Sequence, residues 1–487
     1  MTNDFFRCTS MISLILQQSP AWHLGSVMEG FKTIIEPFKI KTVEPIKMTT
    51  AEQRKVFLER AHYNTFLLQS NQVAIDLLTD SGTSAMSSDQ WAAMMRGDES
   101  YAGASSWSKM EEEIKSLTGY AHILPTHQGR AAERILYGYL GGKGRTFISN
   151  THFDTTRANI EFTGAEAIDI PVPEATHILE NHAFKGNLDT VKLKKLISEK
   201  GAENIGAVIL TVTNNSGGGQ PVSMANAKEV SEICRSNNVL FILDACRIAE
   251  NSYFIRLRER GYENKSYRDI ASEMFSLADG AIMSLKKDGL VNMGGFLALR
   301  DDQLSAACTE LLIVTEGYAT YGGLSGRDME AIAVGLKEVF DPDYLHYRIR
   351  STAYLGERLR NMGVPLIWPI GGHAVYVDAR SFYSHIPVEQ YPGQALVCEL
   401  YLMGGIRSVE IGSVMFGKYD ESHQLIPAPM ELVRLAIPRR VYTQSHIEFV
   451  LEVFEKLLYG REKVKGFEIT FEPRFLRHFM AHFRRVG

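Results

Sequence analysis

The stretch VILTVTNNSGGGQPVSMANAKEVSEICRSNNVLFILDACR, residues 208–247, decides the fold. Near-continuous runs of β-branched and large apolar residues occupy positions 208–213 and 239–245, and such runs are typical of strands buried on both faces. Residues 223–238 between them have helical character, with Ser223 as a suitable N-cap. A strand, a crossover helix and a second strand predict a mostly parallel sheet covered by helices, which is the α/β class.

Composition excludes several classes of protein. The 487 residues are 45% hydrophobic and 22% charged with a net charge of −5, so the chain can bury a large core and has no electrostatic footprint for nucleic acid. No apolar stretch approaches the ~18 residues that cross a membrane. The five cysteines form no CxxC pair, which predicts a chain of the reducing cytoplasm without disulfides.

The pattern divides the chain into four parts. Residues 1–27 are expected to form a loosely ordered N-terminal extension, because Asp4 weakens the positive region that a signal peptide needs before the apolar run MISLIL. Residues 28–86 are expected to form an N-terminal arm and part of a small domain. Residues 87–340 alternate strand-like runs with amphipathic stretches and predict the large domain, and residues 341–487 predict a smaller α+β domain.

Polar residues follow the predicted strands at the points where the strands end. In open α/β sheets ligands bind beyond the carboxyl ends of the strands, so these residues are candidates for one site. A strand-to-helix turn, where backbone N–H groups point outward, is also a natural anion site. The candidates are Asn214, Asn215, Asp244, Arg247, Ser284, Lys286 and Lys287, with the turn residues Gln128, Gly129 and Arg130.

This set of side chains is the one that pyridoxal phosphate chemistry requires. A lysine amine binds that cofactor covalently, a carboxylate pairs with the pyridinium nitrogen, and a helix N-terminus with guanidinium or hydroxyl donors holds the phosphate. Each residue alone could equally be a cap or part of a solvated turn, and the interpretation rests on their joint occurrence. Other chemistries lack a motif: GGKGR (residues 141–145) does not have phosphate-loop spacing, and neither HExxH nor GxSxG occurs.

From about Ile35 to its C-terminus the chain resembles the β-eliminating lyases, which are pyridoxal-phosphate enzymes of the aspartate-aminotransferase fold, or fold type I. The resemblance rests on long strings, among them PTHQGR (125–130), SLKKDGLVNMGGF (284–296), GGHAVYVDAR (371–380) and RLAIPRRVYTQ (434–444). It implies a large domain built on a mostly parallel sheet, together with a smaller α+β domain.

The resemblance implies a role for each candidate residue. Lys287 would carry the cofactor and Asp244 would hold the pyridinium nitrogen. Phe153 would stack on the ring, Arg247 would lie near the ring oxygen, and Gln128, Gly129, Arg130, Ser284 and Lys286 would lie on the phosphate side. Asn215, also counted as cofactor-binding, and Arg434 would bind the substrate carboxylate in a pocket lined by Thr79 and Ser81. Arg434 is chemically suited because a guanidinium fork matches both carboxylate oxygens.

The resemblance also implies a monovalent cation, K⁺, and an assembly of four identical chains in the cytoplasm. The cation would bind Glu99 and the backbone oxygens of Gly82 and Asn292, with Glu99 reaching in from a neighbouring subunit. The expected partner is a small-molecule amino acid, with no role for nucleic acid or membrane.

Three residues bear on which amino acid is cleaved. Asp154, Ile411 and His478 stand where the tyrosine-cleaving members of the family have threonine, arginine and phenylalanine. An indole offers one N–H and a large apolar surface, which suits a carboxylate in an apolar wall, whereas a phenol needs charge stabilisation. The sequence therefore favours elimination of L-tryptophan to indole, pyruvate and ammonia, with Tyr101 as the candidate to assist protonation of the indole carbon.

Alternatives stay open at this point. Cleavage of L-tyrosine to phenol, pyruvate and ammonia is the nearest one, and an inactive cofactor-binding homologue is another. Asp154 could be a simple turn residue, and His478 could be a histidine packed near the end of the chain.

Overall fold

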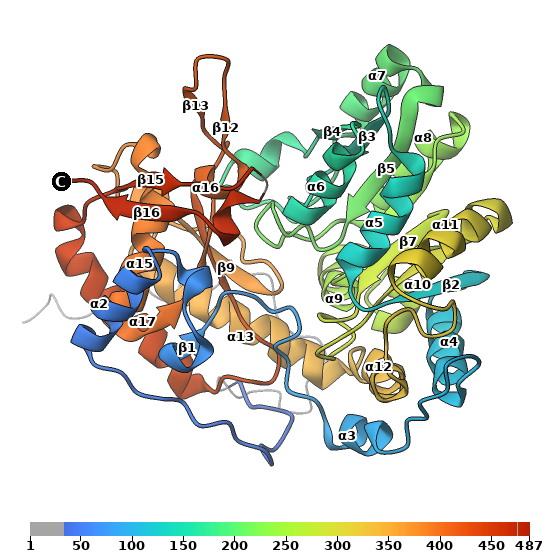
Figure 1. Ribbon diagram of the computed structural model, residues 1–487, viewed down its shortest axis with the longest axis horizontal. Helices are drawn as coiled ribbons and strands as arrows, with labels where there is room; N and C mark the ends of the chain where they lie inside the picture. Colours follow the sequence, from blue (N-terminus) through green and yellow to red (C-terminus); the bar gives the residue numbers. More distant parts are fainter. Residues whose placement is uncertain (1–33, 475) are drawn as a thin grey trace, which may run out of the picture.

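The computed structural model describes residues 34–474 and 476–487, and its elements are labelled in Figure 1. The predicted extension, residues 1–27, lies outside the described residues, as do the first residues of the predicted arm. Figure 1 shows two lobes, with the green and yellow middle of the chain in one and the orange and red C-terminal part in the other.

A seven-stranded sheet forms the centre of the large lobe, in the order β2-β8-β7-β6-β5-β3-β4. β8 runs antiparallel to both of its neighbours, and the other neighbouring pairs are parallel. The predicted α/β class with a mostly parallel sheet is therefore confirmed. The strands are β2 His122–Thr126, β3 Thr146–Ser149, β4 Glu166–Asp169, β5 Ile205–Thr211, β6 Phe241–Asp244, β7 Gly280–Ser284 and β8 Gly295–Leu299.

The stretch that predicted the fold forms the predicted unit. β5 and β6 pair in parallel and are joined through α8 (Met224–Ser236), whose N-cap Ser223 accepts a hydrogen bond from the N–H of Asn226. Side chains alternate across a strand, and in β5 Val208 and Leu210 enter one apolar cluster while Ile209 enters the cluster on the opposite face. Burial on both faces explains why this strand has no polar face in the sequence.

Helices cover the central sheet and carry the residues that follow its strands. α5 begins where β2 has ended, α6 follows β3, and α9 follows β6. The helices of this lobe are α3 Ser88–Met94, α4 Ser105–Thr118, α5 Gly129–Leu140, α6 Asp154–Phe162, α7 Thr190–Lys200, α9 Ile248–Arg258, α10 Tyr267–Ser276, α11 Asp302–Thr315 and α12 Gly326–Glu338.

The small lobe is built on an antiparallel sheet of β11 (Val409–Ile411), β14 (Leu432–Ala436) and β9 (Ala374–Asp378). Two further strand pairs are β1 (Ile75–Asp76) with β10 (Ile406–Arg407), and β15 (Phe467–Phe471) with β16 (His482–Arg485). A hairpin of β12 (Lys418–Tyr419) and β13 (Leu425–Ile426) projects from the lobe (Figure 1). Its helices are α2 Ala51–Arg60, α13 Pro342–Asn361, α14 Ala379–Phe382, α15 Pro392–Gly404, α16 Ser413–Phe416 and α17 Gln444–Gly460.

Residues from both ends of the chain share the core of the small lobe. Leu58 of α2 and Leu77 belong to the same apolar cluster as Val433 of β14 and Phe454 of α17. Figure 1 shows the blue α2 beside the orange α15, and residues of these two helices are in contact. We therefore propose that the part of residues 28–86 that packs here belongs to the small domain with residues 341–487, while 87–340 form the large domain.

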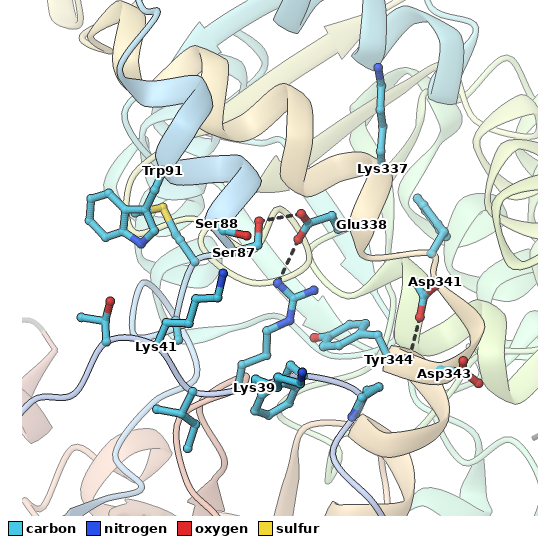
Figure 2. Close-up of a pocket in the computed structure, with 18 residues that line it drawn as sticks. Lys39, Lys41, Ser87, Ser88, Trp91, Lys337, Glu338, Asp341, Asp343 and Tyr344 are labelled. Atoms are coloured by element: carbon cyan, nitrogen blue, oxygen red, sulfur yellow. Dashed lines mark hydrogen bonds and ion pairs between the residues drawn. The ribbon is translucent and has the colours of Figure 1, made fainter. Parts of the chain in front are cut away.

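A groove of about 1190 Å³ lies where the N-terminal segment, residues 37–42, passes α3 and the α12–α13 connection (Figure 2). Glu338 accepts hydrogen bonds there from Ser87 Oγ (2.6 Å) and Arg440 Nη1 (2.9 Å). These bonds join α12 to the start of α3 and to the small lobe. Among the described residues, no helix has the length and apolar character that crossing a membrane requires.

Candidate active site

A cavity of about 230 Å³ opens at the carboxyl ends of β5, β6 and β7, and both lobes contribute to its wall. This is the edge at which an open α/β sheet is expected to bind a ligand. The predicted site residues that line it are Thr79, Ser81, Gln128, Gly129, Arg130, Phe153, Asp154, Asn215, Asp244, Arg247, Ser284, Lys286, Lys287, Arg434 and His478. Segments that are far apart in the sequence thus meet at one place.

The start of α5 packs directly against the end of β7. Gly129 is the first residue of α5, and a Cβ at this position would lie 2.7 Å from Cβ of Ser284. A Cβ on Gly295 of β8 would lie 2.6 Å from the carbonyl carbon of Gln128. Only glycine fits at either position, and the close packing brings the N–H groups of the α5 N-terminus to the cavity, where they suit an anion.

Three cations meet at this end of the cavity without carboxylate partners. Arg130, Lys286 and Lys287 line the cavity, and none of them forms an ion pair with any described residue. Burial lowers the pKa of Lys286, and the charges of Lys287 and Arg130 lower it further. Arg130 is exposed and the two lysines are half-buried, and three positive charges gathered without acidic partners suit a phosphate dianion.

Asp288 fixes the turn that carries Lys287. Its carboxylate accepts hydrogen bonds from the N–H of Ala249, in the first turn of α9, at 2.8 Å and from Arg439 Nη2 at 2.9 Å. Negative charge at a helix N-terminus is favourable, so Asp288 holds the turn after β7 against α9. The lysine next to it is thereby positioned in the cavity.

The last residue of β6, Asp244, supplies a carboxylate that can pair with a protonated ring nitrogen. Asp244 is buried and lines the cavity, where its Oδ1 accepts one backbone hydrogen bond, from Cys246. The cations, the α5 N-terminus and Asp244 together match the phosphate and ring of pyridoxal phosphate, and the cofactor fits the donor set of this cavity.

Glu133 also lines the cavity, besides Asp154 and Asp244. Sequence reasoning missed this carboxyl group. It is buried, and its oxygens accept hydrogen bonds from the hydroxyls of Thr155 and Thr156, while burial raises its pKa to about 7. Its spacing could have revealed it, because Glu133 lies four residues after Gly129 and so on the same face of α5.

Asn215 and Arg434 form the next part of the wall. Asn215 Oδ1 accepts hydrogen bonds from Arg434 Nη1 (3.1 Å), from the Tyr376 hydroxyl (2.8 Å) and from His373 Nε2 (2.9 Å). Arg434 Nη2 donates to the Leu78 carbonyl, whereas its Nε is buried without a partner among the described residues. Because Arg434 lines the cavity and forms no ion pair with a described residue, its guanidinium suits a carboxylate ligand.

The other end of the cavity is apolar apart from one pair of side chains. Asp154 Oδ2 lies 3.0 Å from His478 Nε2, in an ion-pair contact that is not aligned as a hydrogen bond. The His478 ring packs against Phe66 and Phe479, with ring centroids 5.7 and 4.1 Å away. Val409 and Met415 complete this wall. The arrangement can hold a large aromatic group that presents one hydrogen-bond donor.

Six predicted residues lie outside the lining of the cavity, among them the buried Asn214, whose Oδ1 accepts a hydrogen bond from the N–H of Gly217. Tyr101 is 71% exposed and stacks on Tyr318, and Ile411 is buried in an apolar cluster with Val409, behind the lining. The Gly82 carbonyl accepts a hydrogen bond from the Asn292 side chain at 3.0 Å. Glu99 pairs with Arg327 and accepts a hydrogen bond from the N–H of Gly326. Among the described residues, neither Gly82 nor Asn292 forms a hydrogen bond with Glu99.

Arg247 lines the cavity but also pairs with a residue that sequence reasoning did not consider. Its guanidinium binds both carboxylate oxygens of Asp80, at 2.7 and 3.0 Å. Burial alone would raise the pKa of Asp80, but the charge of Arg247 and other nearby cations outweighs burial and holds the pKa well below its usual range. Asp80 thus keeps Arg247 in place at the cavity wall.

Comparison with known proteins agrees with this geometry. The chain matches the family described as Beta-eliminating lyase over residues 76–452. It is 56% identical to the tryptophanase of Salinibacter ruber over 453 residues, or 93% of this chain and 96% of that protein. It is 49% identical to the tyrosine phenol-lyase of Clostridium tetani over 456 residues, or 94% and 99%.

A solved structure gives the same fold at low sequence identity. Leishmania major threonine aldolase has a TM-score of 0.56 and 15% identity, covering 79% of this chain and 99% of its own. The predicted fold type I is thereby confirmed, while the family match and the relatives support the predicted cofactor and confirm the class of reaction. This chain belongs to the β-eliminating lyase family, and it is a pyridoxal-phosphate-dependent lyase that catalyses β-elimination.

Proposed function

We propose that the substrate is L-tryptophan and that the products are indole, pyruvate and ammonia. The observation that supports this choice is the Asp154–His478 pair set in a wall of Phe66, Phe479 and Met415. A carboxylate can accept the indole N–H, and the apolar wall can cover the two fused rings.

Residues already placed at the cavity would hold the cofactor, which supplies an electron sink for the α-carbon of the substrate when it is bound. We propose that Lys287 binds it covalently and that Asp244 pairs with the ring nitrogen. Gln128, Gly129, Arg130, Ser284 and Lys286 would hold the phosphate, Phe153 would pack on the ring, and Arg247 would lie beside the ring oxygen.

Different side chains around the substrate would bind its carboxylate, accept the α-proton and stabilise the leaving group. Arg434, with its unpaired Nε, and Asn215 would bind the α-carboxylate, next to Thr79 and Ser81. Nζ of Lys287 would accept the α-proton as general base. Asp154 would accept the indole N–H and stabilise positive charge that develops on that nitrogen as C3 is protonated.

Two of the predicted sites would need a second chain. Tyr101 lies on the surface, so any help it gives in protonating C3 would be given across a subunit interface. The same holds for Glu99 at a K⁺ site with Gly82 and Asn292. Both placements support an assembly of at least two chains; from the family resemblance we propose a homotetramer, and we place the enzyme in the cytoplasm.

Product analysis tests the proposal. Purified protein with pyridoxal phosphate and KCl is incubated in parallel with L-tryptophan and L-tyrosine, and indole, phenol and pyruvate are measured. We expect indole and pyruvate in equal amounts and little phenol. A higher kcat/KM for phenol release would assign the enzyme to tyrosine instead, and replacement of KCl by NaCl tests the cation.

A further inference from the structure

Two buried glutamates lie together beneath the apolar end of the cavity. Glu410 is the middle residue of β11, and Glu431 immediately precedes β14. Both are buried, and a Cβ on Gly412 would lie 2.6 Å from Oε1 of Glu410 and 2.6 Å from Oε2 of Glu431. These two oxygens are therefore no more than twice that distance apart, and any residue larger than glycine at position 412 would separate them.

The two carboxyl groups hold the start of the short helix α16. Glu410 accepts hydrogen bonds from the N–H groups of Val414 (3.0 Å) and Met415 (3.1 Å), and Glu431 accepts from the N–H (3.3 Å) and the hydroxyl of Ser413. The first N–H groups of a helix have no partner within the helix, so here the glutamates supply the missing acceptors.

Arg477 binds carbonyl groups along the same segment. Its guanidinium donates to the carbonyls of Ser413, Val414 (2.7 Å) and Gly417 (2.7 Å). The segment 413–417 is thus fixed by two acids at its N–H groups and by one guanidinium at its carbonyls.

This segment forms the wall that would face the leaving group. Met415 lines the cavity, and so does Val409, which lies beside Glu410 in β11 and points to the opposite face of the strand. Arg477 is followed directly by His478, the partner of Asp154. A shift of α16 therefore changes the surface that covers the departing ring and leaves the lysine end of the cavity unchanged.

We propose that Glu410 and Glu431 are positioning residues that share one proton, and that this proton holds the wall of the leaving-group pocket in its tryptophan-binding form. The inference rests on the proposed function, because it concerns the pocket for the indole. With one proton between them, one carboxyl group donates and the other accepts. Without it, two negative charges face each other in a buried site.

The charges around the pair support one shared proton. Burial raises the pKa of Glu410 to about 8, and the charge of Glu431 adds to the effect; burial also raises the pKa of Glu431. Asp378 faces Glu431 with a further negative charge and Arg380 with a positive one, while α15 presents Gly393 to Glu410. A raised carboxyl pKa stabilises the folded wall at low pH, and that contribution is lost as pH rises through about 8.

The test compares two substrates across pH. The ratio of kcat/KM for L-tryptophan to that for an S-alkyl cysteine isolates the pocket wall, since both substrates need the same lysine. For the wild type we expect this ratio to fall by about tenfold between neutral pH and pH above 9, the factor that corresponds to one pKa unit.

Glu431→Gln should remove the pH dependence of the ratio, because with one acid replaced by an amide no second negative charge can form beside Glu410. Glu410→Gln should lower the ratio at every pH, because its NH₂ group opposes a backbone N–H of α16. Glu399→Gln is the matched control: this glutamate of α15 pairs with Arg485 in the same lobe and away from the wall, and the wild-type profile should persist.

A structural measurement on the wild type tests the shared proton independently of the kinetics and needs no variant. Hydrogen exchange of the amides of residues 413–415 should accelerate above pH 8 beyond its intrinsic pH dependence. A wild-type ratio that is flat with pH, or a Glu431→Gln profile like that of the wild type, would overturn the shared proton. Release of phenol instead of indole would overturn the proposed function, while the exchange result would still decide the question of the proton.

Discussion

Two groups of charges in this protein, one at the open cavity and one buried between the lobes, are arranged in opposite ways. At the cavity, Arg130, Lys286 and Lys287 stand together without carboxylate partners among the described residues. At the junction of the lobes, three acids and three arginines are all paired. Asp80, Glu250 and Asp288 meet Arg247, Arg348 and Arg439 there at distances that include 2.7, 2.8, 2.9 and 3.0 Å.

The paired charges at the lobe junction stabilise the fold, whereas the unpaired cations of the cavity are suited to bind a ligand. The junction contains equal numbers of opposite charges, so it can be buried without any other molecule. Arg439 contacts all three acids, Asp80, Glu250 and Asp288. Through Asp288 it joins the small lobe to the turn beside Lys287. The cations of the cavity have no such partners among the described residues, so they are free to pair with an anionic ligand.

The largest expected effect is at the cavity. Lys287→Ala should lower kcat by roughly 10⁴-fold, the upper end of what loss of a general base costs, and should abolish covalent attachment of the cofactor. Borohydride reduction followed by peptide mapping checks the attachment. Lys286→Ala is the matched control and should still be labelled at Lys287. A label at Lys286 in the wild type would exchange the roles of the two lysines.

Breaking the paired group should instead lower stability. Arg439→Met leaves three carboxylates without their shared partner, and removal of one partner from a buried ion pair costs about 3–5 kcal/mol in the free energy of unfolding. Urea unfolding of the two proteins measures the loss. Arg440→Met is the control, because among the described residues Arg440 forms its one ion pair with the less buried Glu338, beside a contact with the Tyr344 ring, and we expect a loss of about 1 kcal/mol or less. Equal losses would contradict the comparison.

The Asp154–His478 pair combines the two arrangements, since it is both an ion-pair contact and part of the cavity wall. Asp154→Ala should lower kcat/KM for L-tryptophan by about 10²-fold, as expected when one group that stabilises developing charge is removed. Elimination from an S-alkyl cysteine should change far less. Asp169→Ala removes a second Asp–His pair, with His152, and should affect both substrates alike. Equal losses in Asp154→Ala would exclude its role at the indole.

Residues at strand ends could be predicted from the sequence because their position follows from local structure. The runs around β5, β6 and β7 fix where each strand stops, and parallel strands stop at one edge. Asp244 and Ser284 are the last residues of β6 and β7 and lie within this edge, as the pattern alone indicated. The resemblance added Arg434 and His478, which lie in the small lobe and could not be placed by periodicity.

The sequence could not predict which charges pair with one another across long separations. Asp80 and Arg439 are 359 residues apart, and neither belongs to a motif with a known ion-pair spacing. The same holds for Glu410 and Glu431, which approach only because β11 pairs with β14. Tyr101 and Glu99 would mark the other limit, because in our proposal they complete a site on a neighbouring chain.

Glu133 gives the most discriminating test of the comparison, because it is a buried acid whose hydrogen-bond partners are hydroxyl and amide groups instead of cations. Burial raises its pKa to about 7, so the protonated form is favoured in the folded protein, and its contribution to stability is lost as pH rises from its usual range through 7. Glu133→Gln cannot titrate. Relative to this variant, the wild type should lose about 2 kcal/mol of unfolding free energy between pH 5 and 8. Urea midpoints across that range measure the difference, and Glu161→Gln, an exposed change in α6, should behave as the wild type does. Parallel profiles for wild type and Glu133→Gln would mean that Glu133 is ionised throughout and is paired with a cation, as the acids at the lobe junction are.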